Sequence, residues 1–189
     1  MAIRPARMSE ALHVAAFVDI AGHGVDLDEW VARSSHDDRS VIAAARRLVL
    51  EDPSWNYHYS KAHLLEVDGE IAGGLIGSLV TQSTVETDRQ YINPLSLLES
   101  RVVGFWSILG VAVYPEFRGR GFARLLLDHA RELGRQTGAT GLSLVVEDTN
   151  EPALAAYRAY GFREAERLPW IAYGGRKGPR FWLMLTLQF

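Results

Sequence analysis

The sequence contains no cysteine. This absence excludes disulfide bonds, zinc sites with thiolate ligands and cysteine nucleophiles, so an acyl-cysteine intermediate is not available to this chain. Basic residues are not in excess either, since 20 Lys and Arg stand against 23 Asp and Glu, for a net charge of -3. This balance favours neither nucleic acid nor an anionic membrane surface as a partner.

Long apolar segments are also missing. The two longest uncharged runs, residues 71–85 and 102–115, are both too short to span a bilayer. The first ten residues carry charges without an apolar core, unlike a signal peptide. We therefore expect a cytoplasmic protein with no membrane partner. Because no linker, repeat or low-complexity segment divides the chain, residues 1–189 are expected to form a single domain with one full core.

The hydrophobic spacing predicts an α/β protein with alternating strands and helices. Ser9 is the expected N-cap of a first helix, with Leu12, Ala15, Ala16 and Ile20 on its buried face. Thr81–Arg101 is expected to be a loop over the substrate side. Strands are predicted at residues 3–6, 62–67, 71–80, 105–113, 142–147, 161–172 and 181–187, and helices at 9–22, from 26, from 38, at 119–137 and at 152–160.

The most informative segment is residues 111–124, where an apolar run ends at Tyr114-Pro115 and a glycine-rich turn leads into a helical pattern. Glycines let the backbone approach a ligand closely, and the first turn of a helix has unpaired N–H groups aligned with its dipole. Strand, glycine-rich turn and helix N-terminus together indicate an anion site. No Gly-Lys-Ser/Thr closes the turn, and the spacing departs from G-x-G-x-x-G, so neither common nucleotide motif fits.

The segment from Arg118 to Ala123 reads R-x-x-G-x-A and follows the strand pattern V-A-V-Y-P. It resembles the acetyl-CoA motif of the GNAT N-acetyltransferases. Residues 150–162 resemble a second signature of that superfamily, N-x-x-A-x-x-x-Y-x-x-x-G-F. The two signatures stand in the right order, and the resemblance covers nearly the whole chain. It implies the GNAT fold, which has a mixed, mostly antiparallel central sheet of six to seven strands flanked by helices.

The resemblance also implies which residues bind acetyl-CoA. Backbone N–H groups of residues 119–123 would hold the pyrophosphate, and the main chain of the preceding strand would pair with the pantetheine. One such N–H would polarise the thioester carbonyl. A plain turn made of small residues is the alternative. The implied cofactor-binding residues are Val111, Ala112, Val113, Arg118, Gly119, Arg120, Gly121, Phe122, Ala123, Asn150 and Tyr157.

Two residues of the second signature have alternative roles. Asn150 is a favoured N-cap for the helix that follows, and contact with the pantetheine arm is compatible with capping. Tyr157 is the leading candidate for the general acid that protonates the departing thiolate. Packing of Tyr157 between helix and sheet is the alternative, and packing is the expected role of Tyr160.

The general base is not identified by the sequence. Ribosomal-protein alanine acetyltransferases of the superfamily have a Glu five residues before the Asn, where this chain has Val145. Glu147 shares the strand parity of Val145, while Leu109 and Gly110 supply no acid. An ordered water chain is a further alternative. Glu147, Glu99, His58 and His23 stay open as candidates.

The acceptor site is expected between the first two helices and the Thr81–Arg101 loop. Aromatic residues there would enclose a ligand or contact an ammonium group, and acidic residues would hold a cation. The alternative is that the tryptophans belong to the core and the acids to a helix N-terminus. The aromatic candidates are Trp30, Trp55, Tyr57, Tyr59 and Trp106, and the acidic ones are Asp26, Asp28 and Glu29.

The sequence therefore predicts an N-acetyltransferase that moves an acetyl group directly from acetyl-CoA to a primary amine, without a metal. It resembles a poorly characterised, small-amine branch of the superfamily, with a small-molecule amine or a free peptide N-terminus as acceptor and no nucleic-acid partner. Homodimers are common in the superfamily. One rival is a CoA-binding regulatory module without transferase activity. The other, an α/β nucleotide enzyme, would lack suitably placed acidic metal ligands.

Overall fold

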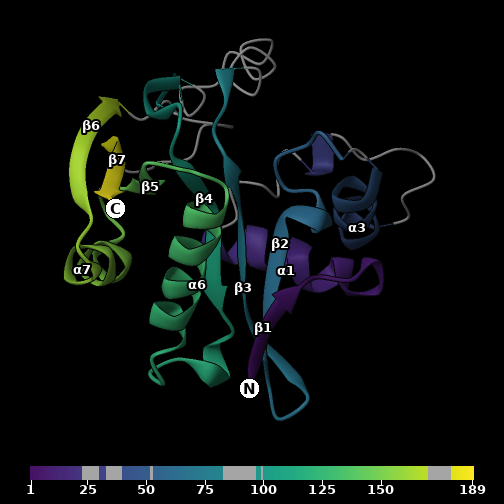
Figure 1. Ribbon diagram of the computed structural model, residues 1–189. Coiled ribbons are helices and arrows are strands. Elements are labelled where there is room, and N and C mark those ends of the chain that lie inside the picture. The colour runs from purple at the N-terminus through teal and green to yellow at the C-terminus, as the bar shows by residue number, and fades with distance from the viewer. Residues whose placement is uncertain (23–29, 33–39, 52, 83–96, 99, 170–179) are drawn as a thin grey trace. The chain divides into compact units, whose positions relative to one another are not determined.

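The computed structural model describes residues 1–22, 30–32, 40–51, 53–82, 97–98, 100–169 and 180–189. Helices and strands are interspersed along the chain, as Figure 1 shows. The strands are β1 (Ala2–Pro5), β2 (Ala62–Val67), β3 (Glu70–Leu79), β4 (Trp106–Val113), β5 (Gly141–Glu147), β6 (Arg163–Pro169) and β7 (Phe181–Gln188). The α-helices are α1 (Ala11–Ala21), α3 (Val41–Glu51), α6 (Phe122–Gln136) and α7 (Glu151–Tyr160). Short 3-10 helices are η1 (Met8–Glu10), η2 (Tyr59–Lys61), η3 (Ser100–Val102) and η4 (Pro115–Phe117).

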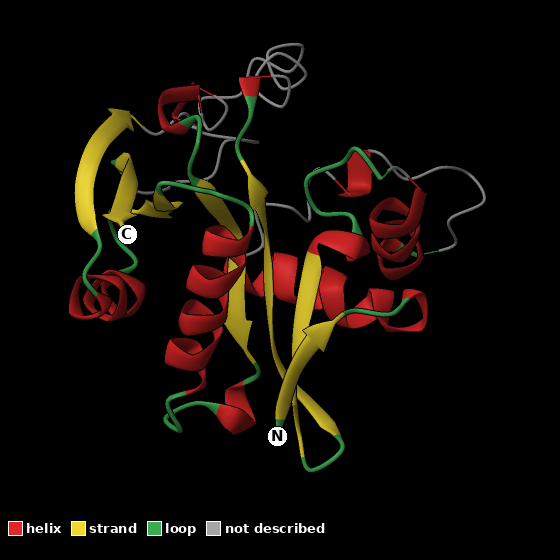
Figure 2. Ribbon diagram, viewed as in Figure 1, coloured by secondary structure: helices red, strands yellow, loops and turns green. Residues whose placement is uncertain are grey.

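The strands form one seven-stranded sheet in the order β1-β2-β3-β4-β5-β7-β6. β4 and β5 are parallel. The pairs β1–β2, β2–β3, β5–β7 and β6–β7 are antiparallel. Helices flank the sheet (Figure 2), so the predicted mixed, mostly antiparallel sheet is confirmed. The turn between β2 and β3 is also as predicted, since Asp68 and Gly69 both have positive φ.

The first of two compact units comprises residues 1–77 and 109–129. Adjacent glycines of β3 show which helix covers which face of the sheet here, because successive residues point to opposite faces. A Cβ on Gly74 would collide with the ring of Phe17 in α1, and one on Gly73 would lie 3.3 Å from Leu126 in α6. α1 therefore covers one face of β3 and the start of α6 covers the other (Figure 1).

The first helix starts later than predicted. Ser9 lies within η1, and Glu10 is the N-cap residue of α1, without a capping hydrogen bond from its side chain. Leu12, expected in the core, is 48% exposed. Ala15 is buried and Ile20 packs against the core, as predicted, and the buried residues of the helix are Ala11, Val14, Ala15, Phe17 and Val18. The predicted helix from Asp26 falls outside the described residues apart from residues 30–32, which are helical.

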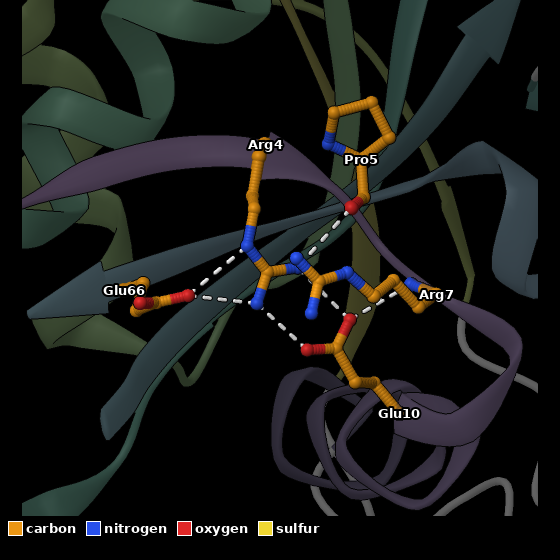
Figure 3. A network of polar contacts seen from close by, with 5 residues as sticks. All are labelled: Arg4, Pro5, Arg7, Glu10 and Glu66. Carbon is orange, nitrogen blue, oxygen red and sulfur yellow. Dashed lines mark hydrogen bonds and ion pairs between the residues drawn. The ribbon is translucent and has the colours of Figure 1, made fainter. Parts of the chain in front are cut away.

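An arginine joins β1, η1 and β2 in the first unit (Figure 3). The Arg4 guanidinium donates to both carboxylate oxygens of Glu10 at 2.7 and 2.9 Å, and to Glu66 at 2.8 and 3.0 Å. The backbone N–H of Arg7 adds a bond to Glu10 at 2.8 Å. These bonds lower the pKa of Glu10 to about 2, the Arg4 hydrogen bonds being the largest cause. Glu10 is thus engaged by Arg4, which explains why it does not cap α1.

A second polar contact joins β2 to α6. Nδ1 of His63 lies 2.9 Å from Nε2 of His129. Burial lowers the pKa of His63 to about 4, and the neighbouring His129 adds to this shift. His63 is therefore neutral in the folded protein at pH values where the unfolded chain is already protonated.

This difference predicts a loss of stability in acid. Between about pH 6.5 and pH 4 the unfolded chain binds more protons at His63, so the free energy of unfolding falls as the pH falls. Because His63 is only partly buried, we expect it to contribute about 1–2 kcal/mol to this loss. Urea unfolding at pH 7.5 and pH 4.5 measures it, with His63→Gln as the matched variant. An equal pH dependence in both proteins would show that His63 is not the responsible group.

The second unit comprises residues 78–108 and 130–189. Within it, one apolar cluster is formed by the buried residues Val80, Leu98, Val102, Trp182 and Met184, with Phe105, Val145 and Leu168 packed against them. Leu98 belongs to the predicted Thr81–Arg101 loop, of which residues 83–96 and 99 lie outside the described part. Among the helices that are described, none has the length and apolar character needed to cross a membrane.

Gly141 lies in β5 beside β7, and its surroundings leave no room for a side chain. A Cβ there would collide with the backbone oxygen of Leu187 and lie 2.7 Å from the ring of Phe105. We expect Gly141→Ala to lower the free energy of unfolding by about 2–3 kcal/mol, because a backbone atom has to move. Gly110→Ala is the control, since its Cβ would meet Ala21 at 3.4 Å and Ile76 at 4.0 Å, both side-chain atoms at ordinary contact distances. Equal Tm values for the two variants would refute the argument.

Candidate functional site

The glycine-rich turn joins the end of β4 to the start of α6 in the first unit. η4 follows Tyr114 directly, and Arg118 is extended, with φ -68° and ψ 163°. Gly119 and Gly121 then have φ of 76° and 79°, a left-handed conformation that only glycine adopts without strain. Alternation of this kind turns successive N–H groups toward one side and forms a concavity for an anion.

The N–H groups of the turn are available to a ligand. Within the described part of the chain, the backbone N–H groups of residues 119–123 have no recorded acceptor. The next ones, of Arg124 and Leu125, both donate to the carbonyl oxygen of Gly121, at 3.1 and 3.3 Å. The free donors therefore lie at the N-terminus of a 15-residue helix, where the helix dipole favours negative charge.

Two arginine side chains brace the turn. Nε of Arg118 donates to the carbonyl oxygen of Val113 at 3.1 Å, and a terminal nitrogen of Arg120 donates to that of Glu116 at 3.1 Å. The Arg120 guanidinium also lies 5.4 Å from the centre of the Phe117 ring. Both arginines are exposed. They hold the turn in shape and place positive charge beside its free N–H groups.

The main chain of β4 has a free edge just before the turn. β4 pairs with β5 only over Trp106–Ile108, and no later pair with β5 is recorded among the described residues. The N–H of Tyr114 donates to Ala72 of β3. Since alternate residues direct their polar groups to opposite edges, those of Val111 and Val113 face away from β3. The side chains of Ala112 and Val113 are buried, so the backbone of this segment is the part offered to a ligand.

Asn150 and Tyr157 belong to the second unit, on α7. Oδ1 of Asn150 accepts from the N–H of Ala153 at 3.3 Å, so its predicted capping role is confirmed. Gly161 ends α7 in the left-handed region, and its N–H and that of Phe162 both bond to the carbonyl oxygen of Tyr157. Asn150 and Gly161 of the second signature therefore lie at the two ends of this helix.

The Tyr157 ring packs edge-on against Phe162, with ring centres 5.8 Å apart. Burial raises the pKa of Tyr157 to about 12. Its phenol therefore stays protonated at every ordinary pH, which suits a proton donor rather than a base. Tyr160 also packs against Phe162, with ring centres 6.0 Å apart, as expected for a packing residue.

Among the candidates for the general base, His58 is engaged in contacts that hold the local structure. It is buried, its Nδ1 pairs with the Ser60 hydroxyl at 2.8 Å, and its Nε2 lies 3.3 Å from the carbonyl oxygen of Leu50. Val145 packs into the apolar cluster with Trp182 and Met184. Glu147, at the end of β5, is half-buried and has a partner. Glu99 and His23 lie outside the described residues.

Most of the aromatic candidates for the acceptor site are core residues. Trp30 is buried in the core of the first unit, and Trp55, Tyr57 and Tyr59 pack against that core. Trp106 is buried in the second unit. This placement favours the interpretation of these rings as structural. Asp26, Asp28 and Glu29 lie outside the described residues.

Comparisons with known proteins find acetyltransferases. A family model described as the Acetyltransferase (GNAT) family matches residues 26–162. Streptothricin acetyltransferase of Streptomyces lavendulae is 43% identical over 56 residues, which is 30% of this chain and 30% of that protein. The ribosomal protein bS18-alanine N-acetyltransferase of Salmonella typhimurium is 37% identical over 59 residues, 31% of this chain and 40% of that protein. Each match therefore spans less than half of the curated relative.

Among solved structures, an N-acetyltransferase from Staphylococcus aureus Mu50 aligns with a TM-score of 0.69. The alignment covers 99% of this chain and 100% of that one, at 20% sequence identity. At such an identity the likeness shows that the two chains share a fold.

Proposed function

This chain belongs to the GNAT acetyltransferase family, and we propose that it transfers an acetyl group from acetyl-CoA to a primary amine within a ternary complex. The observation that carries the proposal is the run of free backbone N–H groups at residues 119–123, at the N-terminus of α6. A pyrophosphate is the part of acetyl-CoA that such a concavity of donors suits.

In the proposed complex the turn binds the pyrophosphate through these N–H groups, and the charges of Arg118 and Arg120 favour its approach. The polar groups of Val111 and the N–H of Val113, whose carbonyl oxygen already accepts from Arg118, pair with the amide groups of the pantetheine. One main-chain N–H of this strand polarises the thioester carbonyl, a contribution of about 3 kcal/mol when the donor is well aligned. Asn150, which already caps α7, contributes a further contact to the pantetheine.

The transfer needs no covalent enzyme intermediate. The nitrogen of the neutral amine attacks the carbonyl carbon of the thioester, the C–N bond of the amide forms, and the C–S bond breaks. Tyr157 protonates the departing thiolate and is restored from solvent. The proton lost by the amine leaves through ordered water, since none of the described base candidates suits the role better.

The acceptor is proposed to be a small-molecule amine or a free peptide N-terminus. The two curated relatives support both alternatives, because one is named for streptothricin and the other for an alanine of ribosomal protein bS18. The net charge of -3 provides no steering toward ribosomal RNA or basic protein tails. We favour the small-molecule amine for this reason.

Release of thiol from acetyl-CoA tests the proposal against a panel of amines. The panel holds streptothricin, polyamines, aminoglycosides, amino acids, and short peptides that begin with alanine. Because the chain has no cysteine, every thiol that appears above spontaneous hydrolysis comes from CoA. Release that depends on one class of amine is the expected result and identifies the acceptor class.

A CoA-binding module without transferase activity is the second candidate, favoured by the apolar Val145 at the position where some relatives have a catalytic Glu. Both the acetyltransferase and the regulatory module would bind acetyl-CoA, but only the acetyltransferase would transfer its acetyl group. Tight binding of acetyl-CoA together with silence across the whole panel would favour the module.

A further inference from the structure

Two histidines far apart in the sequence meet in the first unit, away from the glycine-rich turn. Nδ1 of His63, in β2, lies 2.9 Å from Nε2 of His129, in α6, although 66 positions separate the two residues along the chain. The ring centres are 4.8 Å apart, and the ring planes are inclined by 55°. Both side chains are half-buried, so the pair is held by its surroundings and still open to small solutes.

The backbone on each side of the pair is fixed. His63 stands opposite Pro5 of β1 and Leu75 of β3, so β2 is paired on both edges at this position. His129 lies beside Leu126 and Ala130, which are fully buried against the sheet. The two elements that carry the imidazoles are therefore held in place, and the side chains already face each other.

The distance between the nitrogens suits a metal ion. With metal–nitrogen bonds of about 2.0–2.1 Å, two ligands at a right angle have nitrogens about 2.9 Å apart, and two tetrahedral ligands about 3.4 Å. The observed 2.9 Å is the length of a hydrogen bond between the rings and lies close to both spacings, so a small rotation of the rings lets both nitrogens face one metal ion. Imidazole nitrogens suit copper, nickel and zinc, whereas magnesium and calcium prefer oxygen.

We propose that His63 and His129 form a two-histidine site for a divalent transition metal that imidazole nitrogen suits, such as copper(II), nickel(II) or zinc(II). No cluster of three or more His, Asp or Glu residues suited to a metal occurs among the described residues, so water completes the coordination shell. Binding requires both facing nitrogens to offer a lone pair. The proton of the present hydrogen bond therefore has to leave the facing nitrogen, either to the other nitrogen of the same ring or to solvent.

The bound metal links β2 to α6, the helix whose N-terminus forms the glycine-rich turn. The metal takes part in no step of the proposed acetyl transfer, so a test of this site does not depend on the proposed function. Its direct effect is on stability, because an ion that binds only the folded chain shifts unfolding to higher temperature.

The test uses the full chain without a histidine tag. With nickel at about 100 times its dissociation constant, the Tm is expected to rise by about 5–10 °C, while magnesium leaves it unchanged. His63→Gln and His129→Gln are each expected to abolish the shift. His13→Gln is the matched control and retains it, because His13 is also a half-buried histidine of this unit, paired with Tyr114.

A spectroscopic measurement keeps the proposal testable if a variant fails to fold. Copper(II) added in equimolar amount to the wild-type chain is expected to give an electron paramagnetic resonance spectrum with two equatorial imidazole nitrogens. A nickel shift that persists in both glutamine variants would overturn the proposal. So would a wild-type copper spectrum without nitrogen couplings.

Discussion

Tyr157→Phe is expected to lower kcat about 100-fold or more, with the dissociation constant for acetyl-CoA unchanged. The phenylalanine ring retains the edge-on contact with Phe162, so only the hydroxyl is lost. Without it the thiolate has to leave unprotonated or take its proton from water, and general acids contribute about 10²–10⁴ in rate. Because the pKa of Tyr157 is raised to about 12, the donor is protonated throughout the working range, and deprotonation of this phenol is not expected to limit kcat below pH 10.

Tyr160→Phe is the matched control, since Tyr160 lies on the same helix and packs on the same ring of Phe162. Its kcat is expected to stay within about twofold of wild type. Steady-state kinetics with the best amine of the panel, together with acetyl-CoA titrations, compares the two variants. A Tyr157→Phe rate within about twofold of wild type would remove the acid role and leave Tyr157 as a packing residue.

Gly121→Ala is expected to weaken acetyl-CoA binding about 100-fold. Gly121 has φ 79°, so an alanine there is strained and shifts the turn toward another conformation. Misalignment of two N–H···phosphate bonds costs about 3 kcal/mol, which corresponds to this loss of affinity. Isothermal titration of acetyl-CoA measures it directly.

Gly138→Ala separates the binding effect from backbone strain. Gly138 follows the other end of α6, with φ 75°, and a Cβ at either glycine would meet nothing within 4 Å. Both variants should therefore lose a similar stability, about 1–2 kcal/mol, while Gly138→Ala retains wild-type affinity. Equal affinities in the two variants would mean that the turn does not hold the pyrophosphate.

The glycine-rich turn could be predicted from the sequence because its determinants are local. Two glycines, a preceding apolar strand and a following helical pattern occupy one short segment, and their conformations depend little on the rest of the chain. The same holds for the Asp68-Gly69 hairpin and for the capping of α7 by Asn150. In each case the residue has a strong local preference, for positive φ or for helix capping, and that preference agrees with the conformation observed at its position.

Features that depend on distant partners could not be predicted. The start of α1 was placed at Ser9 because Ser is a favoured cap, yet Arg4 and η1 decide where that helix begins. Arg4 and Glu66 are 62 positions apart, and no spacing rule relates them. The sequence leaves His58 as a candidate for the general base, because its contacts with Ser60 and the Leu50 carbonyl oxygen are visible only in the structure. The aromatic candidates for the acceptor site are ambiguous for a further reason, because aromatic residues serve the core and a ligand equally well.

Acetyl-CoA labelled with carbon-13 in the acetyl carbonyl tests the central claim most directly. The enzyme, the labelled donor and the amine selected by the panel are incubated together, and the label is followed by nuclear magnetic resonance while thiol release is measured. Direct transfer predicts one labelled amide for every thiol released and no label on the protein. Label recovered as free acetate, or thiol release that does not depend on the amine, would contradict the assignment of this chain as an amine acetyltransferase.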